Sequence, residues 1–138
     1  MSDKVFLDTN VFVYTQSKDE AVKRNIALKT LKKYDCCTST QVFNEVSNVM
    51  IKKLKMSIAD VKQIITAINN RCEVSIIDFE TIQKALDLKD LYGYSYYDSL
   101  IIATAVLSDC DCIFSEDLHD GQIIDNKIEI VNIFKRNI

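Results

Sequence analysis

The hydrophobic positions of the chain alternate between short runs of strand character and longer stretches with helical spacing. Runs rich in β-branched and other apolar residues predict strands, whereas apolar residues three and four positions apart predict helices. The expected strands are Lys4 to Leu7, Cys36 to Thr38, Glu73 to Ile77, Asp111 to Phe114 and Ile128 to Val131. The expected helices are a short one from Val11, Glu20 to Tyr34, Thr40 to Leu54, Ser57 to Arg71, Glu80 to Tyr92 and Ser95 to Ser108.

This alternation is typical of an α/β protein with helices on both faces of a parallel sheet. We therefore expect a three-layer α/β/α sandwich whose central parallel sheet has about four to five strands. No linker or repeat divides the chain, so a single domain is expected over residues 1–138. In such folds ligands bind outside the carboxyl ends of the strands, which directs attention to residues 8–10 and 115–117.

The charge balance narrows the function classes. The formal net charge is −3 and the isoelectric point is about 5.1, so the chain lacks the strongly basic composition typical of nucleic-acid binding. If the protein handles nucleic acid, its lysines must gather on one face. No apolar run approaches the ~18 residues that span a membrane, and the N-terminus shows no secretory signal, so a cytoplasmic protein is expected.

Cysteine and histidine usage excludes other chemistry. The five cysteines fit neither a disulfide framework nor the usual zinc spacing, and we expect them to be small buried side chains in a reducing compartment. The single histidine, His119, excludes a metal-free ribonuclease that uses two histidines as acid and base.

Two carboxylates follow predicted strands, and a third is carried by a helix. Asp8 and Asp117 lie just after strands, although both positions also suit turns or helix caps. Glu45 falls on the apolar stripe formed by Val42, Val46 and Val49, and therefore faces inward. An inward carboxylate needs either a lysine or arginine partner or a bound cation.

Asp98 repeats the pattern of Glu45, because it shares a helix face with Ile101, Ile102 and Ala105. An alternative role is a capping box with Ser95 at the start of that helix. If the four carboxylates converge, they repel one another, and a divalent cation would relieve the repulsion. Oxygen-only ligation favours Mg²⁺ or Mn²⁺, which can activate water for phosphodiester cleavage.

Four short motifs that contain these carboxylates occur in order along the chain. They are Asp8-Thr9-Asn10 after an apolar strand, Asn44-Glu45-Val46, Tyr97-Asp98-Ser99, and Ser115-Glu116-Asp117. Together they resemble the PIN-domain family, specifically its small VapC-like ribonuclease toxins, over nearly the whole chain. The resemblance implies a Rossmann-like PIN fold and a toxin of a type II toxin–antitoxin pair. Such a toxin hydrolyses RNA with a Mg²⁺- or Mn²⁺-activated water.

The same resemblance assigns roles to residues. It implies that Asp8, Glu45, Asp98 and Asp117 are the catalytic and metal-binding residues. It implies supporting roles for Thr9, Asn10, Ser115 and Asp120, the last as an extra ligand. It also implies a homodimer and a cognate antitoxin that places a basic side chain in the acidic pocket. Tyr97 stands where the family often has Trp, and Ile133 where similar relatives often have Pro, which leaves the RNA target open.

A basic cluster and an aromatic residue are candidates for RNA contacts. Lys52, Lys53 and Lys55 gather at one helix end, and Tyr97 precedes Asp98. Lysines bind phosphates and aromatic rings stack on unpaired bases. The lysines equally suit a solvated helix C-terminus, and the tyrosine equally suits a helix contact or a dimer interface.

Two other function classes remain open on the sequence alone. Aspartyl phosphotransfer, as in haloacid-dehalogenase-like phosphatases, also uses an aspartate after the first strand, but it needs a second one where this chain has Asn10. A catalytically silent PIN-like module that binds nucleic acid or a protein would retain the same residues. RNA cleavage that depends on metal and on Asp8 distinguishes these alternatives.

Overall fold

The computed structural model describes residues 3–136, so the terminal residues Met1, Ser2, Asn137 and Ile138 lie outside the description. The strands are β1 (Lys4–Leu7), β2 (Asp35–Ser39), β3 (Glu73–Ser75), β4 (Cys112–Phe114), β5 (Ile123–Ile124) and β6 (Ile128–Val131). The helices are α1 (Thr9–Tyr14), α2 (Ala21–Lys33), α3 (Thr40–Lys52), α4 (Ile58–Arg71), α5 (Phe79–Tyr92) and α6 (Tyr96–Leu107).

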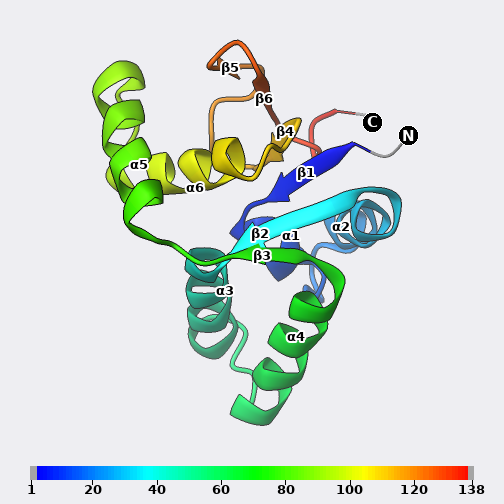
Figure 1. Cartoon of the computed structure of the whole chain (residues 1–138). Coiled ribbons are helices and arrows are strands. Elements are labelled where there is room, and N and C mark those ends of the chain that lie inside the picture. Colours follow the sequence, from blue (N-terminus) through cyan, green and yellow to red (C-terminus); the bar gives the residue numbers. More distant parts are fainter. Residues whose placement is uncertain (1–2, 137–138) are drawn as a thin grey trace.

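The strands form one six-stranded sheet in the order β3-β2-β1-β4-β6-β5 (Figure 1). Five of them, from β3 to β6, run parallel, which confirms the predicted α/β class. The sixth, β5, is antiparallel to β6 and was not predicted, because two residues are too short to show a pattern. Asp125 and Asn126 make the turn between them with positive φ angles of 53° and 54°, a conformation that these residue types tolerate.

The helices cover both faces of the sheet. Helices α2 and α4 lie on one side of β1, β2 and β3, and α5 with α6 lies on the other (Figure 1). The chain moves outward from β1 to β2 and β3, then crosses over to place β4 on the opposite side of β1. Crossovers between parallel strands are right-handed. The helices that lead toward β3 and those that lead toward β4 therefore lie on opposite faces of the sheet. The gap between β1 and β4 is therefore the switch point, where α/β sheets bind ligands.

The central strand is fully buried, as expected for a strand covered on both faces. Val5, Phe6 and Leu7 have no exposed surface. Helix α2 packs on the sheet through small side chains, because it buries Ala27 and Thr30 while Leu28 is exposed. The Thr30 carbonyl accepts the thiol of Cys36 in β2, which shows how closely this helix approaches the sheet.

Side-chain caps begin several helices close to the strand ends. Ser39 caps α3, Ser57 caps α4 and Ser95 caps α6, each by accepting a backbone N–H from the first turn of its helix. Ser95 thus takes the capping role that the sequence offered for the start of this helix. Four of the five cysteines are buried, and all five are free thiols. Between residues 3 and 136, no helix has the length and apolar character that a membrane crossing requires.

Candidate active site

A cavity of about 260 Å³ brings the four predicted carboxylates together beside the switch point. Asp8 comes from the end of β1 and Asp117 from the segment after β4, while Glu45 projects from α3 and Asp98 from the first turn of α6. The cavity is lined by Asp8, Thr9, Asn10, Glu45, Asn48, Val49, Asp98, Ile101 and Asp117. Residues that are far apart in the sequence therefore form one acidic pocket.

Asp8 is held in place at the end of β1 by three hydrogen bonds. Its backbone N–H donates to the Phe114 carbonyl at 3.1 Å, which extends the pairing of β1 with β4 by one step. Its Oδ1 accepts the Thr9 N–H at 2.7 Å, and its Oδ2 accepts the Ser115 hydroxyl at 2.8 Å. Burial, together with the charges of Glu45 and Asp117, raises the pKa of Asp8 to about 6, and the two hydrogen bonds oppose this rise.

Glu45 is half-buried and held by neutral donors. Its carboxylate accepts the Thr9 hydroxyl at 2.5 Å and the Gln41 side-chain amide at 3.3 Å. The same amide donates to the Tyr97 carbonyl at 3.0 Å, so Gln41 connects α3 to the start of α6. Within residues 3–136 no lysine or arginine forms a salt bridge with Glu45. The described chain thus supplies no cationic partner for this inward carboxylate.

The remaining two carboxylates differ in how they are held. Asp117 is exposed and accepts the Asn10 side-chain amide at 2.9 Å. Asp98 is half-buried, and its backbone N–H donates to Ser95 at 3.1 Å. The second half of the capping box does not form, because no donor among the described residues bonds to the Asp98 carboxylate. That carboxylate is therefore available to a ligand in the pocket.

A charged network beside the pocket was not predicted from the sequence. Glu116 accepts the Tyr14 hydroxyl and the Lys23 ammonium, each at 2.6 Å. Burial opposes the ionisation of Glu116, but these two donors bring its pKa below the usual range. The network joins α1 and α2 to Glu116. It therefore helps to hold Ser115 and Asp117, the neighbours of Glu116 in the chain, beside the carboxylates.

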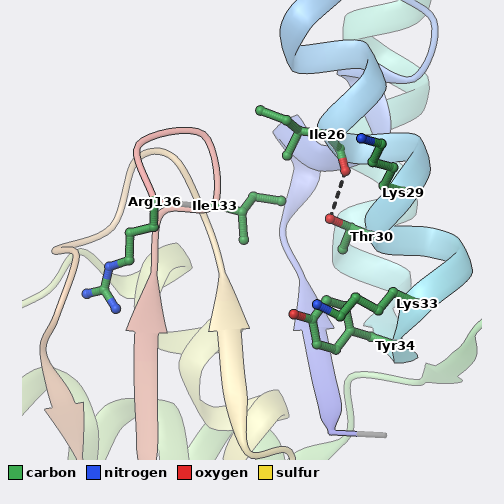
Figure 2. A pocket seen from close by; sticks show the side chains of 7 residues that line it. All are labelled: Ile26, Lys29, Thr30, Lys33, Tyr34, Ile133 and Arg136. Atoms are coloured by element: carbon green, nitrogen blue, oxygen red, sulfur yellow. Dashed lines mark hydrogen bonds between the residues drawn. The ribbon is translucent and has the colours of Figure 1, made fainter. Parts of the chain in front are cut away.

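Asp120, predicted as an extra ligand, does not line the pocket. It accepts the Asn132 backbone N–H and forms a salt bridge with Arg136, both at 2.9 Å. Arg136 in turn belongs to a separate hollow beside α2 (Figure 2). Residues lining this hollow are Ile26, Lys29, Thr30, Lys33, Tyr34, Ile133 and Arg136. Asp120 therefore anchors the C-terminal segment instead of joining the acidic cluster.

The residues predicted to contact RNA are exposed, which is a requirement for binding a large ligand. Lys52, Lys53 and Lys55 lie at the end of α3, and Tyr97 is 66% exposed beside the entrance to α6. Sequence reasoning missed two polar residues close to the carboxylates, Gln41 and Asn48. Asn48 carries a signal that could have found it, because it lies three residues after Glu45 and shares its helix face.

The donor chemistry of the pocket fits a hard divalent cation. Carboxylate oxygens are the ligands that Mg²⁺ and Mn²⁺ favour. Between residues 3 and 136, no three acidic, histidine or cysteine side chains are grouped closely enough to hold one ion. Mg²⁺ usually keeps several waters and takes one or two protein carboxylates, which suits an open arrangement of this kind.

Comparison with protein families identifies the class to which this fold and pocket belong. The family model of the PIN domain matches residues 5–135. The chain therefore belongs to the PIN domain family. A comparison with curated proteins gave no match.

Solved structures of toxins and toxin–antitoxin complexes share the fold. VapC20 of Mycobacterium tuberculosis, described as a sarcin-ricin loop cleaving toxin, is 16% identical with a TM-score of 0.67, over 82% of this chain and 91% of that one. A toxin–antitoxin complex from Klebsiella pneumoniae is 18% identical with a TM-score of 0.68, over 94% and 97%. VapBC2 from Rickettsia felis, bound to a promoter DNA fragment, is 18% identical with a TM-score of 0.64, over 94% and 99%.

The raised pKa of Asp8 makes a prediction about stability. Because this pKa is about 6 in the folded protein and ordinarily 3.8, ionisation disfavours the folded state, and stability falls as the pH rises between these values. Asp8→Asn removes this cost; its amide oxygen can still accept the Thr9 N–H, and its NH₂ group can donate to the Ser115 hydroxyl, which reverses that bond. We expect the variant to be more stable than the wild type at pH 7 by on the order of 2 kcal/mol, and the gain to vanish near pH 4.

Urea unfolding in EDTA at the two pH values measures this difference. Asp87→Asn, on the exposed face of α5, is the matched control and should change stability by less than about 0.5 kcal/mol. An Asp8→Asn variant with no gain at pH 7 would show that the pocket does not disfavour the Asp8 charge.

Proposed function

We propose that this PIN domain, spanning residues 1–138, is a Mg²⁺- or Mn²⁺-dependent endoribonuclease and the toxin of a toxin–antitoxin pair. The observation that carries the proposal is the acidic pocket at the switch point, whose four carboxylates have no lysine or arginine partner among the described residues. A bound divalent ion would supply an activated water and neutralise charge on the phosphodiester.

The chain's own residues would hold and orient the reacting groups. Asp8, Glu45, Asp98 and Asp117 are the proposed catalytic and metal-binding residues, and they would hold the ion either directly or through the waters that it keeps. Ser115 and Thr9 fix the direction of the Asp8 oxygens, and Thr9 also holds Glu45. Asn10 holds Asp117 in the same way. These neutral donors orient the carboxylates without cancelling their charge, which leaves that charge available to a cation.

Cleavage of total cellular RNA by the purified protein tests this function. We expect cutting in Mn²⁺ or Mg²⁺ and none in EDTA. Asp8→Asn and Asp98→Asn should each reduce the rate by roughly a hundredfold or more, because a preorganised charge at the reacting centre is removed. Asp120→Asn is the matched control and should retain activity, since Asp120 lies outside the pocket.

The opposite outcome has a defined meaning. Well-folded protein with verified metal occupancy that binds RNA but cuts none, with binding unchanged by Asp8→Asn, would favour the catalytically silent module. That result would refute the nuclease function, whereas the membership in the PIN domain family would be unaffected.

A cognate antitoxin is the second part of the proposal. A pocket with four carboxylates is complementary to a lysine or arginine from a partner, and the Klebsiella pneumoniae neighbour is described as a toxin–antitoxin complex. We expect expression of the wild-type chain, but not of Asp8→Asn, to arrest growth. The product of a small open reading frame adjoining the gene should relieve the arrest, and equal arrest with and without it would count against an antitoxin.

A homodimer is also proposed, supported by an exposed apolar stripe on α5. Phe79, Ile82 and Leu86 lie three and four residues apart and are 73%, 36% and 52% exposed. Such a stripe can pair with its own copy across a two-fold axis. Light scattering should show dimers for the wild type and for Val22→Glu, an exposed site on α2, but monomers for Leu86→Glu. A wild-type monomer would refute the dimer.

The protein is further proposed to work in the cytoplasm. Its five cysteines are free thiols, four of them buried, as is usual for proteins of a reducing compartment.

A further inference from the structure

A second cavity lies one helical turn from the acidic pocket. Its volume is about 550 Å³, and it opens between the α1–α2 connection and the α3–α4 connection. Both cavities are bordered by the segments that carry α1 and α3. Asn10 and Val49 line the acidic pocket, whereas Gln16 and Lys53 line the second cavity. The two cavities are thus neighbours along the same pair of packed helices.

Helix α3 joins the two cavities by a single stripe. Glu45, Val49 and Lys53 are spaced four residues apart, so they lie one above the other on one face of the helix. Lys53 keeps helical backbone geometry and donates its N–H to the Val49 carbonyl, so the stripe continues unbroken to it. From Val49 to Lys53 the helix rises about 6 Å, which corresponds to about two nucleotides of a stacked strand at about 3.4 Å each.

The second cavity is lined by cations that have no partner in the described chain. Lys18, Lys53 and Lys55 line it, and within residues 3–136 none of them forms a salt bridge. Asp19 and Asp60 also line it, so the local balance is three positive charges against two negative ones. Lys55 has a positive φ of 55°, an uncommon conformation for a lysine. The acidic pocket, by contrast, is lined by four carboxylates and, among the described residues, by no lysine or arginine.

We infer that this cavity is a subsite for single-stranded RNA, where Lys53 and Lys55 bind phosphates flanking the bond held at the acidic pocket. The inference rests on the proposed nuclease function and adds where the substrate strand runs. An acidic protein alone repels RNA, so a substrate that enters a pocket of four carboxylates needs cations close by. The stripe on α3 places Lys53 one turn beyond Val49, at the border of the acidic pocket.

The test separates binding from cleavage by using Asp8→Asn as the background. A short fluorescein-labelled single-stranded RNA is titrated at several salt concentrations, and anisotropy gives the affinity. In Lys53→Ala/Lys55→Ala, the slope of log affinity against log salt should become shallower by about 0.7 for each phosphate that is no longer neutralised, or about 1.4 in total. The matched control is Lys29→Ala/Lys32→Ala, two exposed lysines on α2 with the same change in charge.

Cleavage with Asp8 restored supplies the second readout. The lysine pair should raise the KM for RNA and leave kcat unchanged, because neither side chain touches the reacting atoms. The wild type could cut no RNA while Lys53→Ala/Lys55→Ala still makes the salt dependence of binding shallower. That result would refute the nuclease function and support the RNA subsite. Equal salt slopes in the Lys53→Ala/Lys55→Ala variant and in the α2 control variant would refute the RNA subsite. A protein partner would then be the remaining candidate ligand of this cavity.

Discussion

The architecture depends on holding several like charges close together at one edge of a sheet. Asp8, Glu45, Asp98 and Asp117 line a single cavity, and burial there, together with the charges of Glu45 and Asp117, raises the pKa of Asp8 to about 6. Two features of the fold make the arrangement stable enough to form. The parallel pairing of β1 with β4 fixes where Asp8 and Asp117 emerge, and neutral donors from adjacent residues hold three of the four side chains.

The donors come from the same short segments as the acids that they orient. Thr9 and Asn10 follow Asp8 directly, yet their side chains bond to Glu45 and Asp117 instead. Ser115 precedes Asp117 by two residues, and its hydroxyl donates to Asp8. Each of these side chains therefore orients a carboxylate of another motif, so the pocket forms only when the strands and α3 are in place. This interlocking gives a physical reason why the motifs matter as a set.

Much of this could be predicted from the sequence, because it follows from local patterns and from topology. Apolar periodicity located the helices, and the rule that parallel strands end at one edge brought Asp8 and Asp117 together. The contacts that were missed have no local signal. Glu116 bonds to residues 93 and 102 positions away, and the bond from the Gln41 amide to the Tyr97 carbonyl forms only when α3 meets α6. Asp120 could not be separated from the pocket residues, because spacing cannot tell a ligand from a partner of Arg136.

The raised pKa of Asp8 links stability to the proposed function. At neutral pH the folded chain carries a charge that burial disfavours, and no lysine or arginine of the described chain pairs with the neighbouring Glu45. A lysine of the same chain paired with Asp8 or Glu45 would remove the free-energy cost of the buried charge. It would also occupy the position that a bound cation would take. By linkage, whatever binds the ionised form recovers the free energy that ionisation took from folding. On the proposed function, the burial and charge repulsion that disfavour the Asp8 charge in the folded chain strengthen the binding of a divalent ion, or of the basic side chain of an antitoxin.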